Sequence, residues 1–293
     1  MAINTRATGT ILDEIVASCR ERLAADQRVT SEATLVERIA ACGPTIGFAE
    51  RLRDGRDATP DDARLRLIAE IKRASPSKGV FDADLDAARQ AQAYAGAGAA
   101  AISVLTERDH FQGSLDDLAA ARDAVDGSDE RDDRPALLRK DFIFDPYQVL
   151  AARASGADAL LLIVALLEPT DLADLLALTR EHGLEALVEV HDEREMETAA
   201  AAGARVIGIN NRDLRNFNED LATTERLAPL APTGTVIVAE SAIRSAEDAA
   251  RMAAAGVHAL LVGEALVRAT GDGAVDIDAK ARELMLVDGA VQR

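Results

Sequence analysis

The chain has 293 residues, 48% of them hydrophobic, and a formal net charge of −18 at pH 7. Nucleic acids and anionic membranes would repel so acidic a protein, so we expect neither as a partner. The longest apolar run, 157–167, is interrupted by Asp158 and too short for a bilayer, and residues 1–10 lack the apolar region of a signal peptide. We therefore expect a soluble, cytoplasmic protein.

Cysteine and lysine are both scarce. The two cysteines, Cys19 and Cys42, are too few for a disulfide framework, and we expect both to be small core residues in a reducing compartment. Asp and Glu supply 51 residues against 33 Lys and Arg, of which only four are lysine. Charge of one sign is tolerated best where salt screens it over short distances, so this composition indicates a halophilic protein.

The first 60 residues predict helices. Thr10 is a suitable N-cap, and residues 11–23 carry an apolar stripe at helical spacing. A second helical pattern includes Leu35 and Ile39, and residues 51–62 are polar and rich in turn formers. We interpret residues 1–60 as a helical extension packed on the rest of the chain, so that residues 1–293 form a single domain.

From residue 67 onward one pattern repeats: an alanine-rich helical stretch ends at a glycine, and a short apolar run follows. Glycine suits the left-handed position that ends a helix. Near-continuous apolar runs are typical of parallel strands covered on both faces. The predicted strands are 67–72, 101–105, 136–140, 160–164, 186–190, 206–209, 235–240 and 259–263. Eight such units predict an α/β fold, the (β/α)8 TIM barrel, with an N-terminal helical extension.

A doubly wound open sheet is the alternative fold. It often has a Gly-x-Gly-x-x-Gly turn after its first strand, and residues 74–79 do not fit that motif. The acidic stretch 126–134 is predicted to be a solvated connection on the surface.

Active sites of such barrels lie at the C-terminal ends of the strands. The polar or small residues predicted there are Glu70, Lys72, Thr106, Lys140, Glu189, Asn210, Arg212, Glu240, Ser241 and Gly263. Lysine, unlike arginine, exchanges protons near neutral pH once burial or a neighbour lowers its pKa. Lys72 and Lys140 therefore indicate an acid–base site, with a purely structural ring of ion pairs as the alternative.

The turns after the last two predicted strands, 240–243 and 263–265, predict a phosphate site. Loops at these places of a barrel often present backbone N–H groups to a phosphate. Glu264 fits poorly, since its carboxylate must point away from the anion, and two ordinary turns are the alternative.

Several segments at these places resemble the motifs of one family, indole-3-glycerol-phosphate synthase. They are residues 69–79, 138–142, 188–191, 208–214 and 239–241, and residues 11–16 resemble the family's N-terminal helix. The resemblance covers residues 9–270. It implies ring closure, decarboxylation and dehydration of 1-(2-carboxyphenylamino)-1-deoxyribulose 5-phosphate in tryptophan biosynthesis, a carboxy-lyase reaction on a small phosphorylated substrate.

The resemblance also implies roles for the catalytic residues. Lys140 matches the general acid of ring closure, and Glu189, Lys72 and Glu70 match the residues of dehydration, with the division of roles among them left open. Asn210 would orient hydroxyls or the carboxylate. Glu240 and Ser241 would hold the ribulose chain.

The implied substrate-binding residues are Ser75, Arg212, Ala242, Gly263 and Glu264 around the phosphate and ribulose chain, and Phe111 and Phe142 beside the anthranilate ring. No metal and no organic cofactor is implied, and a monomer is compatible with the sequence. The family commonly has glycine where Ala242 stands, so a left-handed conformation there would cost on the order of 1 kcal/mol. His191, one residue past the fifth strand, is interpreted as a supporting or surface residue.

Other functions stay open. A phosphoribosylanthranilate isomerase-like barrel would share the fold and the phosphate site, but it would use a Cys/Asp acid–base pair, and neither cysteine lies at a predicted strand end. A bifunctional fusion would need about 200 further residues, roughly one more domain. A non-catalytic barrel scaffold would have no reason to retain Lys72 and Lys140.

Overall fold

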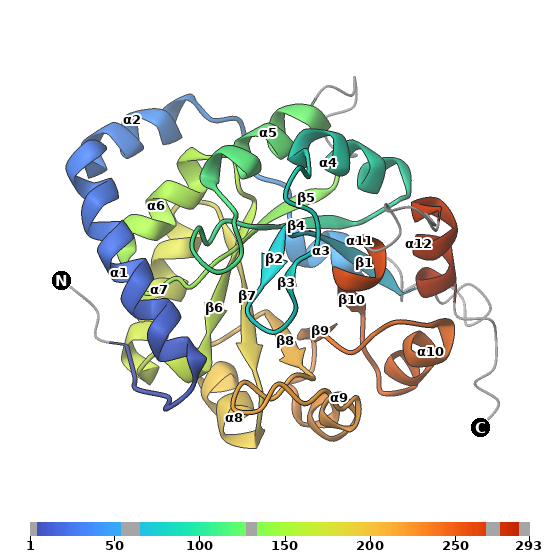
Figure 1. The fold of residues 1–293 in the computed structure, drawn as a ribbon. Coiled ribbons are helices and arrows are strands. Elements are labelled where there is room, and N and C mark those ends of the chain that lie inside the picture. Colours follow the sequence, from blue (N-terminus) through green and yellow to red (C-terminus); the bar gives the residue numbers. More distant parts are fainter. Residues whose placement is uncertain (1–4, 54–64, 127–133, 268–275, 287–293) are drawn as a thin grey trace.

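The computed structural model describes residues 5–53, 65–126, 134–267 and 276–286 (Figure 1). Eight parallel strands close into a barrel in the order β1-β10-β9-β8-β7-β6-β5-β4. They are β1 (Arg66–Ile71), β4 (Ala101–Leu105), β5 (Ala136–Lys140), β6 (Ala159–Ile163), β7 (Glu185–Val190), β8 (Val206–Asn210), β9 (Val236–Glu240) and β10 (Ala259–Val262). The predicted TIM barrel is confirmed, and the ends of every predicted strand agree to within one residue.

Helices follow the strands and surround the barrel (Figure 1). They are α4 (Ala87–Gly96), α5 (Leu115–Val125), α6 (Pro146–Ala154), α7 (Pro169–Glu181), α8 (Glu193–Ala201), α9 (Ala222–Leu227), α10 (Ala246–Ala254), α11 (Glu264–Val267) and α12 (Ile277–Met285), with short 3-10 turns η3 (Val164–Leu166) and η4 (Ala228–Leu230). Asp or Ser side chains cap six of these helices, at Asp86, Ser114, Asp145, Asp192, Ser245 and Asp276. The predicted terminating glycines have positive φ, from +74° at Gly183 to +92° at Gly256, so the repeat was interpreted correctly.

The N-terminal extension forms three helices. They are α1 (Ile11–Val29), α2 (Glu32–Ala41) and α3 (Phe48–Arg53). Thr10 caps α1 as predicted, because its hydroxyl accepts a hydrogen bond from the N–H of Leu12 at 3.2 Å. The prediction of turns from residue 51 was wrong for 51–53, which belong to α3, and 54–62 lie outside the described residues.

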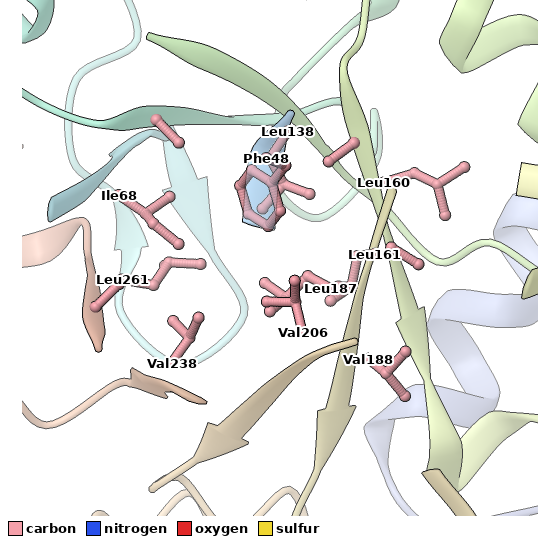
Figure 2. Packing of buried hydrophobic residues seen from close by; sticks show 14 of the residues in the cluster. Phe48, Ile68, Leu138, Leu160, Leu161, Leu187, Val188, Val206, Val238 and Leu261 are labelled. Carbon is pink, nitrogen blue, oxygen red and sulfur yellow. The ribbon is translucent and has the colours of Figure 1, made fainter. Parts of the chain in front are cut away.

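Helix α3 was missed because its apolar residues are few, yet Phe48 and Leu52 are completely buried. Figure 2 shows Phe48 beside Leu138 of β5. The N–H of Ala49 donates to Glu185 at the start of β7, 2.7 Å away. Helix α3 therefore lies against the N-terminal end of the barrel.

Aliphatic side chains fill the middle of the barrel (Figure 2). Ile68, Leu138, Leu187 and Val238 are completely buried. Burial of each such side chain contributes about 1.5–3 kcal/mol to stability. Because side chains two apart on a strand share a face, the next inward positions are Glu70, Lys140, Glu189 and Glu240, which lie on this apolar layer.

The acidic connection 126–134 was predicted to be solvated, and that prediction was wrong for Arg134. Its side chain is buried and pairs with Asp158 at 2.6 Å and with Asp126 at 2.9 Å. Burial of an arginine requires such partners. Residues 127–133 lie outside the described residues.

The two cysteines differ in their surroundings. Both are free, and Cys19 is buried in α1 as expected. Cys42 is only half-buried and follows α2 as its C-cap, so the prediction of a core position was wrong for it. Helix α2 packs mainly through Leu35, which leaves its C-terminal end partly open to solvent.

Candidate active site

A cavity opens at the C-terminal end of the barrel. Nearly all of the predicted site residues line it: Glu70, Lys72, Phe111, Lys140, Phe142, Glu189, Asn210, Arg212, Ser241, Ala242, Gly263 and Glu264. Glu240 lies just beneath the wall, 1% exposed and bonded to Lys140. Ser75 and Thr106 are exceptions. Ser75 is buried in the small hairpin strand β2 (Ala74–Ser75), while Pro76 and Ser77 line the cavity instead, and Thr106 is buried and donates to Asp141 at 2.6 Å.

Lys140 is the centre of the charged cluster. Its Nζ donates to Oε2 of Glu240 at 2.9 Å and lies 3.7 Å from Oε2 of Glu70. Burial by itself would lower the pKa of Lys140, but the carboxylates of Glu240, Glu70 and Glu189 raise it above its usual value. The expectation of a lowered lysine pKa was therefore wrong for Lys140, which is an ammonium ion at neutral pH.

Glu70 joins the two lysines. Its Oε1 accepts a hydrogen bond from Nζ of Lys72 at 2.5 Å. Burial opposes ionisation of Glu70, but the ammonium groups of Lys72 and Lys140 hold its pKa below the usual value. Gly263 makes room for it, because a Cβ at that position would lie 2.3 Å from Oε1 of Glu70. Gly263 thus has a packing role that the phosphate prediction did not include.

Glu240 is completely buried and shares Lys140 with Glu70. Burial and the nearby Glu189 carboxylate raise the pKa of Glu240 to about 7, although Lys140 opposes that rise. Its Oε1 has no hydrogen-bond partner among the described residues. Gly208 on β8 leaves the space it needs, since a Cβ there would lie 2.0 Å from that oxygen.

Glu189 has a different environment. Its side chain is 4% exposed, and its Oε1 lies 3.4 Å from Nε2 of His191. Burial opposes ionisation, but His191, together with Lys140 and Asn210, lowers the pKa of Glu189 to about 2. Glu189 is therefore a carboxylate at neutral pH, close to an ammonium ion and able to accept a proton.

Arg212 is held at the rim of the cavity. Its guanidinium pairs with Oε1 of Glu219 at 2.5 Å and donates to Oγ of Ser77 at 3.3 Å. Its backbone N–H donates to Oδ1 of Asn210 at 3.0 Å, which orients that amide. Glu219 also pairs with Arg244. Glu219 and Arg244 were not predicted from the sequence. They lie in the loops after β8 and β9, several residues beyond the strand ends, where no local pattern marks them.

The two turns predicted to hold phosphate have distinct shapes. Ser241 and Ala242 both adopt left-handed conformations, with φ of +65° and +66°. Positive φ without glycine is unfavourable by about 1 kcal/mol or more per residue, so this turn is strained as the sequence predicted for Ala242. In the second turn Glu264 pairs with Lys78 at 3.1 Å.

The apolar wall of the cavity combines distant segments. The rings of Phe111 and Phe142 lie with centroids 6.1 Å apart and planes tilted by 40°. Helix α1 contributes further apolar side chains, Ile11, Leu12 and Ile15, and the loops after β8 and β9 contribute Leu214, Phe217 and Ile243. Sequence reasoning placed the α1 stripe in the core but did not predict that it reaches the site.

Neither cysteine lines this cavity. The acid–base pair of the isomerase alternative is therefore not formed. Within the described ranges no group of three His, Cys, Asp or Glu side chains is arranged to hold a metal ion. No helix in the described part of the chain is long and apolar enough to cross a membrane.

Comparisons with known proteins agree with this geometry. The family model "Indole-3-glycerol phosphate synthase" matches residues 12–283. An indole-3-glycerol phosphate synthase of Dehalococcoides mccartyi is 51% identical over 83% of this chain and 86% of its own length. One from Chlorobium luteolum is 47% identical over 88% and 93%, respectively.

A solved structure with the same fold is thiamine phosphate pyrophosphorylase from Pyrococcus furiosus. It superimposes with a TM-score of 0.53 and 18% identity, covering 75% of this chain and 93% of its own. At that identity the likeness concerns the barrel alone.

Proposed function

Because the chain belongs to the indole-3-glycerol phosphate synthase family, we propose roles for its cavity residues in that family's reaction. The enzyme converts 1-(2-carboxyphenylamino)-1-deoxyribulose 5-phosphate to indole-3-glycerol phosphate, carbon dioxide and water in tryptophan biosynthesis. One carbon–carbon bond forms, one breaks, and one hydroxyl leaves. The chemistry therefore needs a proton donor for ring closure, and a donor and an acceptor for dehydration.

Lys140 is the general acid of ring closure. The observation that carries this role is its position in the cavity wall, with its ammonium held by Glu240 and Glu70. As the aromatic carbon attacks the C2′ carbonyl, the carbonyl oxygen becomes negative and takes a proton from Nζ. Loss of the carboxylate as carbon dioxide then leaves its bonding electrons in the ring and restores aromaticity.

Glu189 and Lys72 carry out the dehydration. Lys72, bonded to Glu70, protonates the leaving hydroxyl, which departs as water. Glu189, which is ionised at neutral pH, takes the proton from the neighbouring carbon of the new ring. Its ionised state at neutral pH suits an acceptor, whereas an ammonium ion suits a donor.

The remaining cavity residues position the substrate. Phe111 and Phe142 flank the anthranilate ring, with the apolar wall from α1 completing that side. Asn210 orients the substrate's hydroxyls or carboxylate, and Glu240 and Ser241 hold the ribulose chain.

The phosphate lies at the two turns after β9 and β10. The residues assigned to it are Ala242, Gly263 and Glu264, mostly through backbone N–H groups, with Ser75 and Arg212 nearby. Ser75 has a buried Oγ that no described group bonds, so a small shift of the β2–β3 hairpin, where β3 is Gly79–Val80, would free a donor for the anion.

Two glutamates of the same strand test the site. Glu189→Gln removes the acceptor at the C-terminal end of β7, and Glu185→Gln changes the same residue type at its N-terminal end. We expect the Glu189 variant to lose about 10²-fold or more in kcat, and the Glu185 variant to stay within about threefold of wild type. Indole fluorescence during incubation with the carboxyphenylamino-deoxyribulose phosphate measures both. Equal rates in the two variants would contradict the assignment.

We also propose that residues 1–293 form one domain that acts as a cytoplasmic monomer. One continuous hydrophobic cluster includes α1, α3 and the barrel strands, which supports a single domain. The negative charge and the free cysteines support the cytoplasm.

A further inference from the structure

His191 directly follows β7 and lies between two carboxylates. Its Nε2 is 3.4 Å from Oε1 of Glu189, an ion-pair distance without a hydrogen bond, and its Nδ1 is 3.0 Å from Oε2 of Glu195. We propose that His191 is a positioning residue that stays an imidazolium ion and thereby keeps Glu189 ionised for proton transfer. This inference rests on the proposed role of Glu189 as a proton acceptor.

The helix that follows His191, α8, anchors the imidazole ring. Oε2 of Glu195 accepts a hydrogen bond from the backbone N–H of His191 at 2.8 Å. The same oxygen is hydrogen-bonded to Nδ1 of the His191 ring. Glu195 lies in the first turn of α8, where its N–H is bonded by the cap residue Asp192 at 2.9 Å. The capped helix therefore fixes Glu195, Glu195 fixes the imidazole, and the imidazole faces Glu189.

Two carboxylates on opposite ring nitrogens favour the charged form. A neutral imidazole has a single N–H and would leave one carboxylate facing a lone pair. The imidazole is 15% exposed, Glu189 4% and Glu195 18%, so solvent screens the interaction only partly. Burial lowers the pKa of His191, but the two glutamates raise it to about 10.

Glu240 provides a comparison within the same site. Both Glu189 and Glu240 are buried and both interact with Lys140, but only Glu189 has an imidazolium neighbour. The pKa of Glu189 is about 2, whereas that of Glu240 is about 7. The difference agrees with a local cation acting on Glu189. It predicts that the pKa of Glu189 would rise toward that of Glu240 if the cation were removed.

The other charged groups around this pair do not replace His191. Lys140 also faces Glu189, but Glu240 and Glu70 share its ammonium. The pKa of Asp213 is lowered mainly by Arg215 and only slightly by His191. Asp192, Arg6, Arg215 and Arg226 line the polar cavity that opens beside His191.

The test is the pH dependence of kcat in His191→Gln. Glutamine keeps a hydrogen-bonding group of similar reach but carries no charge, so the pKa of Glu189 should rise toward the value of about 7 that Glu240 has without such a neighbour. Glu189 then takes up a proton at a higher pH than in wild type. We therefore expect the ratio of wild-type to variant kcat to be a few-fold near pH 8 and to grow at least about tenfold by pH 5.5.

His182→Gln is the matched control, since His182 ends α7 away from the cavity, and its ratio should stay near one at each pH. Glu195→Gln removes only the anchor and should give a smaller rise in the same direction. A ratio that does not change with pH in His191→Gln would overturn the inference. If that variant does not fold, a pH-independent ratio in Glu195→Gln would overturn it. Absence of turnover by wild type would instead refute the proposed function.

Discussion

Lys140→Arg tests the general acid most directly. Arginine keeps the positive charge but does not release a proton near neutral pH. The structure also leaves little room for a guanidinium, because carboxylate oxygens lie 2.9 and 3.7 Å from Nζ. We expect a kcat loss of about 10²-fold or more, equivalent to roughly 3 kcal/mol of transition-state stabilisation, and a loss of about 1–3 kcal/mol in stability from overpacking.

The assay follows indole fluorescence at saturating substrate, with the thermal melt of each variant measured beside it. Lys280→Arg is the matched control: Lys280 pairs with Glu283 at 2.9 Å on α12, outside the cavity. The control should keep wild-type turnover. A Lys140→Arg enzyme that turns over within about threefold of wild type would remove Lys140 from the acid role.

Three further outcomes are expected. Gly208→Ala should lower kcat and should lower stability by about 1–3 kcal/mol in a denaturant titration, because the new Cβ would lie 2.0 Å from Oε1 of Glu240. An unchanged kcat would show that Glu240 can move freely. Lys72→Ala should slow a step after ring closure or weaken substrate binding, and normal single-turnover rates at every step would contradict its role. Raising KCl from about 0.1 M to about 2 M should raise Tm while kcat persists, since screening relieves surface repulsion; an unchanged or lower Tm would mean that the acidity is not a halophilic adaptation.

The repeat of helix, glycine and apolar run was enough to predict the barrel. Each strand is a local pattern of about five residues, and its end is marked by the residue at which polar side chains begin. Because all parallel strands of a barrel end on one side, the linear positions of Glu70, Lys140 and Glu189 already placed them together. The resemblance of several segments to the family's motifs then indicated which reaction the site performs.

The loops and the extension were harder to predict. Helix α3 and the pairing of Arg134 with Asp158 depend on contacts between segments far apart in the chain. The same holds for α1, whose apolar stripe looked like an ordinary core face but also forms a wall of the cavity. A sequence pattern shows that a face is buried, and it does not show what that face is buried against.

The sequence by itself determined the barrel, the strand ends and the residue types of the acid–base cluster, because these follow from local periodicity and parallel-strand geometry. Only the tertiary structure decided the protonation states. Sparse lysine suggested a lowered pKa, yet the carboxylates around Lys140 raise it. Glu189 and Glu240 are the same residue type at the ends of their strands, but His191, Lys140 and Asn210 lower the pKa of Glu189, whereas burial and the Glu189 carboxylate raise the pKa of Glu240. Lys140 lies 3.7 Å from Glu70 of another strand, and no local pattern encodes such a distance between strands.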